Sequence, residues 1–279
     1  MRSQRPPREG QGALPALTRG ATERYARLAR LAEKITVSVG NAIVTNDVDV
    51  VTRKRGRANF ATAADHAAEK AIIAALREHD DSVPVLAEES ARRGLRESER
   101  LWVVDPIDGT LNFSRGIPFY AVVIAYVEDG RARAAAVHAP RTKETFVASE
   151  GRGATRNGKA IRVSDTRRLS QALATASLSY RVMRGAKPKM PRLASACAGM
   201  RDVGSAALGM TYVADGRFDL FAHQFLSPWD TAGPSFIARE AGAAVLSLKS
   251  GADASWHESQ VIIANPALAK AALALLERR

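Results

Sequence analysis

The chain has 279 residues, a formal net charge of +12 at pH 7 and a single cysteine. This length can bury a large core, as one domain or as two closely packed subdomains. No apolar run approaches the roughly 20 residues that a membrane-spanning helix needs. A lone cysteine excludes an internal disulfide and fits a reducing compartment, so we expect a globular, cytoplasmic protein with no membrane association.

The positive charge comes mainly from arginine. Only nine of the 41 basic residues are lysine, and the first 30 residues hold seven arginines against two glutamates. Residues 1–20 are rich in Arg, Pro, Gly and Gln, which is typical of a disordered basic tail; a transit peptide is a second interpretation. Residues 53–57 form a basic cluster with only Phe60 as an aromatic neighbour, which favours a solvated loop over a nucleic-acid site.

Two helices are predicted at the start of the globular part. Apolar residues at helical spacing predict the first over residues 21–44, and residues 45–61 are polar and basic, as in a mobile loop or a hairpin. A second helix begins at Thr62, with Asp65 three residues later. This spacing resembles a capping box, so Asp65 has a structural explanation as well as a functional one.

Two apolar runs then end in carboxylates. Residues 82–87 precede Glu88-Glu89, which in isolation would be an exposed pair in a loop. Leu101–Val104 predict a buried strand. We expect that strand to stop at about Asp105, because Pro106 cannot donate a hydrogen bond to a neighbouring strand.

Asp105 and Asp108 would lie close together at the end of this strand. They repel each other unless a cation lies between them, and aspartate and carbonyl oxygens suit Mg²⁺. An ordinary Asp-Gly turn is the alternative for Asp108. Gly109 permits close approach of the backbone, so that the N–H groups after it can hold a phosphate oxygen, and Thr110 adds a hydroxyl. The motif therefore predicts a metal site.

The rest of the chain alternates strands and helices. Residues 128–130 and Asn157-Gly158 are predicted hairpin turns. The Gly-x-Gly at residues 151–153 lacks the flanking strand and helix of a dinucleotide-binding fold. Predicted strands cover residues 121–127, 132–139, 145–149, 172–176 and 261–264, and predicted helices cover residues 191–200, 202–214, 228–241 and 266–276.

Two of these helix starts carry groups with alternative functions. Gly204-Ser205 offers backbone N–H groups to an anion, or Ser205 is simply a helix cap. Ser227 can cap the following helix, Pro228 suits its first turn, and Asp230 lies where the helix dipole favours a carboxylate. In isolation that is a complete structural explanation for Asp230.

Two motifs together carry a family resemblance. The segment Asp105-Pro-Ile-Asp-Gly-Thr110, combined with Trp229-Asp230, resembles the signature of the inositol monophosphatase family of Mg²⁺-dependent, lithium-sensitive phosphatases. The likeness extends in the same order over residues 21–276. It implies an α+β fold, a layered αβαβα sandwich of two α/β subdomains. We expect the tail at residues 1–20, the subdomain with most metal ligands at 21–165, and the subdomain that completes the site at 166–279.

The resemblance also implies roles for individual residues. Thr110 and Asp65 would be catalytic and orient the attacking water. Two or three Mg²⁺ ions would be held by Glu88, Asp105, the Ile107 carbonyl, Asp108 and Asp230. The substrate-binding positions would be Gly109, Thr110, Gly204, Ser205 and His223.

The sequence departs from the family pattern at two of its positions. Ala87 replaces a glycine before the acidic pair, which is possible only if its backbone is not left-handed. His223 replaces a glutamate that contacts sugar hydroxyls. A neutral imidazole can bond hydroxyls and a cationic one would prefer a second anionic group, while a histidine with no ligand role is the alternative.

The implied function is a phosphoric monoester hydrolase acting on a small alcohol phosphate through a metal-activated water, with an inositol monophosphate-like substrate as the first choice. Histidinol phosphate, fructose 1,6-bisphosphate and a 3′,5′-bisphosphate nucleotide remain alternatives. A homodimer is expected, since family members commonly form one. The alternative of another class is an RNA- or partner-binding protein on a phosphatase scaffold; a Mg²⁺-binding module without turnover is a weaker one.

Overall fold

The computed structural model describes residues 17–45, 51–53, 60–90, 97–177 and 189–277. Most of the predicted basic tail, up to residue 16, lies outside the described residues, as do residues 54–57 of the arginine cluster. In the described part, no helix combines the length and the apolar character that crossing a membrane requires.

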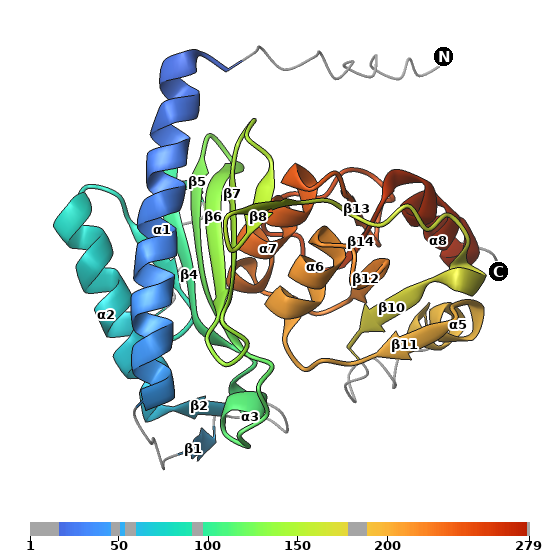
Figure 1. The fold of residues 1–279 in the computed structure, drawn as a ribbon, viewed down its shortest axis with the longest axis horizontal. Helices are drawn as coiled ribbons and strands as arrows, with labels where there is room; N and C mark the ends of the chain where they lie inside the picture. Colours follow the sequence, from blue (N-terminus) through green and yellow to red (C-terminus); the bar gives the residue numbers. More distant parts are fainter. Residues whose placement is uncertain (1–16, 46–50, 54–59, 91–96, 178–188, 278–279) are drawn as a thin grey trace, which may run out of the picture.

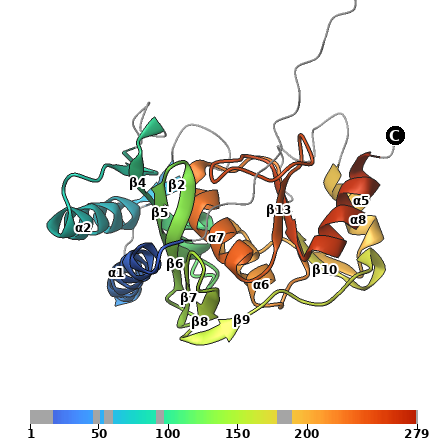
Figure 2. The ribbon, with the colours of Figure 1, turned by 90° about the horizontal axis from the view of Figure 1, so that it is seen from above.

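Helices and sheets alternate in five layers across the molecule (Figure 1). One helix pair covers the outer face of a seven-stranded sheet, a second pair lies between that sheet and a five-stranded sheet, and a third pair covers the far side (Figure 2). This arrangement confirms the predicted αβαβα sandwich. In layer order the helices are α1 (Arg19–Thr45) and α2 (Ala63–His79), then α6 (Ala206–Ala214) and α7 (Pro228–Glu240), then α5 (Lys189–Ala196) and α8 (Pro266–Glu277).

The seven-stranded sheet has the order β3-β4-β5-β6-β7-β8-β9. Only β3 and β4 pair in parallel; the other neighbours are antiparallel. Both predicted hairpin turns are confirmed, with positive φ at Asp129 and Gly130 and at Asn157 and Gly158, as tight turns require. The strands are β3 (Val85–Ala87), β4 (Arg100–Asp108), β5 (Ala121–Glu128), β6 (Arg131–Ala139), β7 (Glu144–Ser149), β8 (Ala154–Arg156) and β9 (Lys159–Ile161).

The five-stranded sheet has the order β11-β10-β12-β14-β13. The predicted helix over residues 191–200 is wrong at its end: it stops at Ala196, and residues 199–201 pair in parallel with β10. Gly199, a poor helix former, begins that strand. The strands are β10 (Leu173–Ala176), β11 (Gly199–Arg201), β12 (Leu220–His223), β13 (Ala244–Ser247) and β14 (Val261–Ala264).

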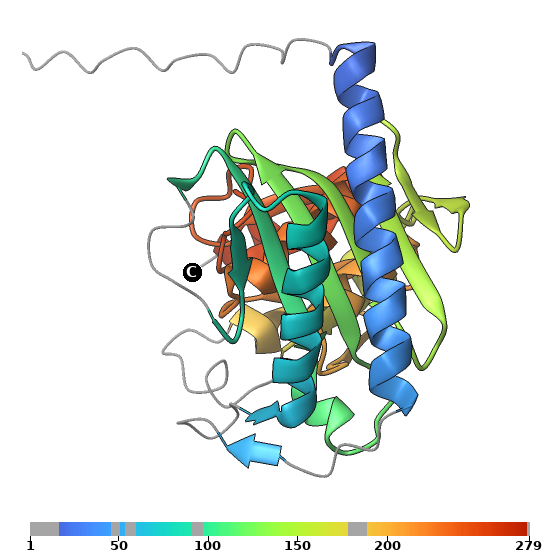
Figure 3. The same ribbon diagram turned by 90° about the vertical axis from the view of Figure 1, so that its left-hand side faces the viewer.

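Three apolar clusters fill the spaces between the layers. The helical spacing that predicted α1 and α2 follows their buried faces, which lie across the seven-stranded sheet (Figure 3). Ile72 and Leu76 of α2 are fully buried there, and burial of each side chain contributes about 1.5–3 kcal/mol to the free energy of folding. On the opposite face α7 lies so close to the sheet that a side chain at Gly233 would press on Val123.

Two short elements complete the fold near the end of β4. Strands β1 (Val51–Arg53) and β2 (Phe60–Thr62) pair antiparallel, which is the hairpin alternative predicted for residues 45–61. The single turn α3 (Thr110–Phe113) follows β4 directly. The division into subdomains at residue 165 stays a prediction.

Candidate active site

Strand β4 continues past the point where the sequence suggested a stop. Asp105 pairs with Val123 of β5, and pairing resumes at Asp108 opposite Ala121, so β4 has one extra residue between the two pairs. The expected end at Asp105 is therefore wrong. The missing N–H of Pro106 is accommodated by a bulge, which turns the local backbone without ending the strand.

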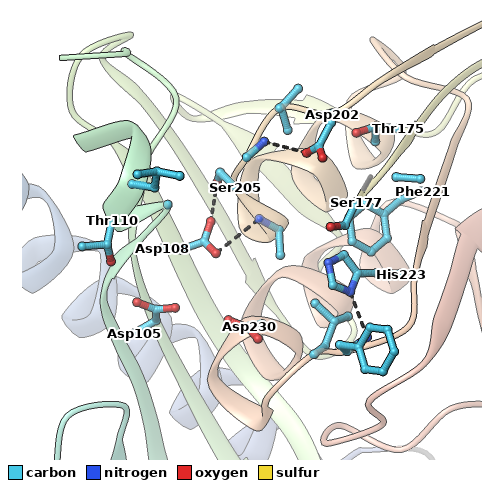
Figure 4. A pocket seen from close by; sticks show the side chains of 18 of the residues that line it. Asp105, Asp108, Thr110, Thr175, Ser177, Asp202, Ser205, Phe221, His223 and Asp230 are labelled. Atoms are coloured by element: carbon cyan, nitrogen blue, oxygen red, sulfur yellow. Dashed lines mark hydrogen bonds between the residues drawn. The ribbon is translucent and has the colours of Figure 1, made fainter. Parts of the chain in front are cut away.

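Three carboxylates meet at this bulge. Asp105, Asp108 and Asp230 each place an oxygen within 4.8 Å of the others (Figure 4). Asp105 and Asp108 are buried, at 1% and 6% exposure. Burial, and then the charges of Glu88 and Asp108, raises the pKa of Asp105 well above its usual range. Such a cluster is stable in its charged form only beside a cation.

Asp108 is also the anion at the start of helix α6. The Ser205 hydroxyl donates to its carboxylate, and the backbone N–H groups of Ala207 and Ala206 donate at 3.0 and 3.2 Å. Burial raises the pKa of Asp108, while these hydrogen bonds act in the opposite direction. The helix start thereby joins the second half of the chain to the end of β4.

Asp230 is a helix cap and also a member of the acidic cluster. It lies in the first turn of α7 and accepts the N–H of Ser227 at 2.6 Å, which completes a capping box. Burial and the charge of Asp108 raise its pKa well above the usual range. The helix cap therefore holds this carboxylate facing Asp105 and Asp108.

Thr110 and Asp65, the two predicted catalytic residues, lie side by side. The Thr110 hydroxyl is 3.0 Å from Asp65 Oδ1 and 3.0 Å from the Ile107 carbonyl oxygen. Asp65 is completely buried in the first turn of α2. Gly109 sets the turn before Thr110 with φ +91°, and a Cβ there would lie 2.9 Å from the Phe119 carbonyl. Only glycine suits that position.

A cavity of about 520 Å³ opens over these groups. Glu88 reaches it from the end of β3. Ala87 belongs to β3 and pairs with Val104, so its backbone is extended and alanine is tolerated. The cavity is lined by Glu88, Asp105, Ile107, Asp108, Gly109, Thr110, Leu111, Thr175, Ala176, Ser177, Asp202, Val203, Gly204, Ser205, Ala206, Phe221, His223, Phe225, Leu226 and Asp230.

His223 belongs to the wall facing the carboxylates (Figure 4). Its Nδ1 accepts the Phe225 N–H at 3.1 Å, so the ring proton of the neutral form lies on Nε2. Burial lowers the pKa of His223 to about 4, outweighing the charge of Asp202. The ring stacks on Phe221 with centroids 6.1 Å apart. Of the two charge states considered, the structure therefore favours the neutral imidazole.

The same wall contains residues that sequence reasoning missed, among them Thr175, Ser177 and Asp202. Asp202 accepts the Gly204 N–H at 3.0 Å, so that predicted anion donor already has a partner. A carboxylate directly after a strand could have identified Asp202, just as it identified Glu88. Asp202 was missed because residues 199–200 were predicted as the end of a helix and not as part of a strand.

The donor set fits a hard divalent cation. Five carboxylates line the cavity, and none of its described lining residues is Lys or Arg. Oxygen ligands of this kind are those that Mg²⁺ prefers. A chain with net charge +12 has thus gathered negative charge at one point.

Comparison with known proteins agrees with this geometry. The family model of the inositol monophosphatase family matches residues 20–279. The chain is 35% identical to a fructose-1,6-bisphosphatase/inositol-1-monophosphatase of Thermotoga maritima, over 83% of this chain and 89% of the relative. It is 34% identical to the Nus factor SuhB of Escherichia coli K12, over 88% and 94% of the two chains.

Solved structures show the same fold. An IMPase of Thermotoga maritima has a TM-score of 0.82 at 32% identity, covering 90% of this chain and 96% of that one. SuhB of Bartonella henselae has a TM-score of 0.83 at 29% identity, covering 90% and 99%. The chain belongs to the inositol monophosphatase family.

Proposed function

We propose that this protein is a Mg²⁺-dependent phosphomonoesterase that hydrolyses a small alcohol phosphate. The observation that carries the proposal is the cluster of Asp105, Asp108 and Asp230 beside the Thr110–Asp65 pair. A phosphate group would be repelled by these carboxylates alone. A bound cation reverses that repulsion. Membership of the inositol monophosphatase family also supports a cation-dependent phosphatase.

The ligands follow from the donor set. Glu88, Asp105 and the Ile107 carbonyl would hold one ion, and Asp105, Asp108 and Asp230 would hold a second. Mg²⁺ bound there supplies a Lewis acid that lowers the pKa of coordinated water and offsets phosphate charge.

The chain's own residues position the water and take up its proton. The Thr110 hydroxyl can donate to Asp65 and accept a hydrogen bond from the attacking water, so that the proton passes toward the Asp65 carboxylate. The water oxygen bonds to phosphorus as the bond to the leaving oxygen breaks, and solvent protonates the alkoxide. N–H groups at Gly109 and Thr110 would hold a phosphate oxygen.

The opposite wall would receive the alcohol. His223 presents Nε2–H as a donor, and a hydroxyl oxygen is a suitable acceptor. Phe225 and Leu111 line the cavity with exposed apolar side chains, which a ring can contact. We infer an inositol phosphate-like substrate first; the three alternatives from the sequence also carry rings or several hydroxyls.

The test is phosphate release from inositol 1-phosphate, histidinol phosphate, fructose 1,6-bisphosphate and adenosine 3′,5′-bisphosphate. Each is assayed with Mg²⁺, with EDTA, and with Mg²⁺ plus lithium. We expect release from at least one, abolished by EDTA and reduced by lithium. No release by folded protein that binds Mg²⁺ would count against this panel of substrates and favour the binding function below.

A second candidate function is binding of RNA or of a protein partner. Relatives 34% identical over most of this chain are named Nus factor SuhB, and the net charge of +12 suits a polyanion. RNA binding measured between 50 and 200 mM salt tests it: a steep salt dependence indicates many phosphate contacts. The homodimer and the cytoplasmic location stay predictions, which light scattering and fractionation can check.

A further inference from the structure

Asn112 joins two loops that line the cavity, although Asn112 itself is not among the lining residues. It lies in α3, four residues after Asp108. Its Nδ2 donates to the carbonyl of Phe119 at 2.7 Å and to the carbonyl of Val203 at 2.8 Å. Both amide hydrogens are therefore used, one within its own loop and one across to the segment that precedes α6.

The two loops interlock at glycines. Gly204 has φ +68°, and a Cβ there would lie 2.8 Å from the Asn112 Nδ2. A Cβ at Gly109 would lie 3.2 Å from the Gly204 carbonyl oxygen and 3.3 Å from Ser205 Cβ. Backbone thus packs directly on backbone and on the Asn112 amide, and neither loop can shift without the other.

Each loop carries a different half of the cavity. One follows the acidic motif and begins at Gly109. The other contains Val203 and Gly204 and continues into Ser205, beside the wall that would receive the alcohol. Among the described residues, a hydrogen bond from the Asn112 side-chain amide to the Val203 carbonyl connects the two loops directly.

We propose that Asn112 is a positioning residue that sets the distance between the acidic half of the cavity and its alcohol-binding half. This inference rests on the proposed phosphatase function. Among the described hydrogen bonds, the Asn112 side chain donates to Phe119 and Val203 and not to Asp105, Thr110 or Asp230. Its loss therefore weakens the fit of the leaving alcohol more than the chemical step.

The test substitutes Asn112→Asp, which keeps the shape but turns an oxygen toward two carbonyl oxygens. Asn112→Ala is a second variant that removes both hydrogen bonds without adding charge. For both we expect KM to rise about tenfold while kcat changes less than about threefold. Mg²⁺ affinity measured by calorimetry should change by a smaller factor than KM, because the Asn112 amide donates to Phe119 and Val203 and not to a proposed ligand.

Asn265 provides a matched control. Its Nδ2 likewise donates to two backbone carbonyls, those of Ser164 at 3.0 Å and Thr166 at 2.7 Å, outside the cavity. Asn265→Asp should lower the melting temperature by a similar amount and leave KM unchanged. An equal rise in KM in both Asp variants would show a general effect of lost stability and overturn the proposal.

Hydrogen exchange gives a readout that needs no substrate. Asn112→Asp should speed amide exchange over residues 203–208, and Asn265→Asp should not. Unchanged exchange there, or an unchanged KM, overturns the positioning role. Absence of turnover in the wild type counts against the proposed function instead, and the exchange result still decides the role of Asn112.

Discussion

Ser205 donates its hydroxyl proton to Asp108, 97 positions earlier in the chain, and the same oxygen accepts the N–H of Leu208 at 3.2 Å. One hydroxyl thus caps helix α6 and holds a carboxylate of the acidic cluster. The helix start and the end of β4 are fixed by a single group, although they belong to elements of different layers.

Ser205→Ala should therefore affect stability and ion binding together. Loss of an N-cap costs about 1 kcal/mol, and Asp108 also loses one of its donors. We expect the Mg²⁺ concentration for half-maximal activity to rise severalfold, as measured by titration, and the unfolding midpoint in urea to fall. Ser195→Ala, which removes an exposed hydroxyl outside the cavity lining, is the control. Unchanged Mg²⁺ dependence would contradict this account of Ser205.

Asp105→Asn should abolish turnover and leave the fold intact. The amide keeps an acceptor for the Ile107 N–H, which the Asp105 Oδ1 accepts at 3.1 Å. It removes a buried charge that burial and neighbouring carboxylates disfavour. Without metal we expect a melting temperature higher by roughly 2–4 °C, about 1 kcal/mol, and no further rise on adding Mg²⁺. Retained turnover would exclude Asp105 as a ligand; exposed Asp165→Asn is the control.

The acidic motif could be predicted because the residues that identify it are neighbours in the sequence. Asp105 and Asp108 follow an apolar run, and Asp230 follows a Ser-Pro helix start, so short stretches of sequence carry the signal. The path of β4 could not be predicted, since only pairing with β5 shows that Pro106 lies in a bulge.

The cavity wall that contains Asp202 and His223 could not be predicted, because it is built by strand pairings between segments that are distant in the sequence. Strands β11 and β12 are three and four residues long, too short for a periodic pattern, and each pairs with β10 across at least 20 residues of sequence. Asp202 follows β11, and its place in the cavity depends on that pairing. His223 was noticed only through the family pattern, and its protonation depends on the N–H of Phe225.

An ion cluster joins strand β8 to the turn that follows helix α6 and predicts a stability effect. Asp215, with 1% of its side chain exposed, accepts from Arg156 and Arg217 at 2.6 Å. Asp215→Asn removes the negative charge that both guanidinium groups face, while each keeps an ion pair with Glu144. We expect a loss of about 1 kcal/mol in urea unfolding, because both arginines also keep some access to water. Asp129→Asn should cost close to zero, because the Asp129 carboxylate is exposed and lies 3.9 Å from Arg133. Equal losses in the two variants would contradict a stabilising role for the Asp215 ion cluster.

His138 predicts how stability depends on pH. It is buried in β6 against α1, where a side chain at Gly40 would collide with its ring. Its Nδ1 lies 2.9 Å from the Thr145 hydroxyl, and its Nε2 has no partner among the described residues. Burial lowers the pKa of His138, so the folded state resists a proton that the unfolded chain accepts near pH 6.5.

The contribution of neutral His138 to the free energy of unfolding is therefore fully present above about pH 6.5. It is lost as the pH falls toward the lowered pKa of the folded state, by at most about 1.4 kcal/mol per pH unit. The measurement is the free energy of unfolding in urea from pH 7.5 to 5, compared between the wild type and His138→Gln. The wild type should lose more stability than the variant over this range, because the variant has no proton to take up at position 138. His257→Gln, at an exposed position, should follow the wild-type curve. Parallel curves for the wild type and His138→Gln would show that another group governs the acid sensitivity of the fold.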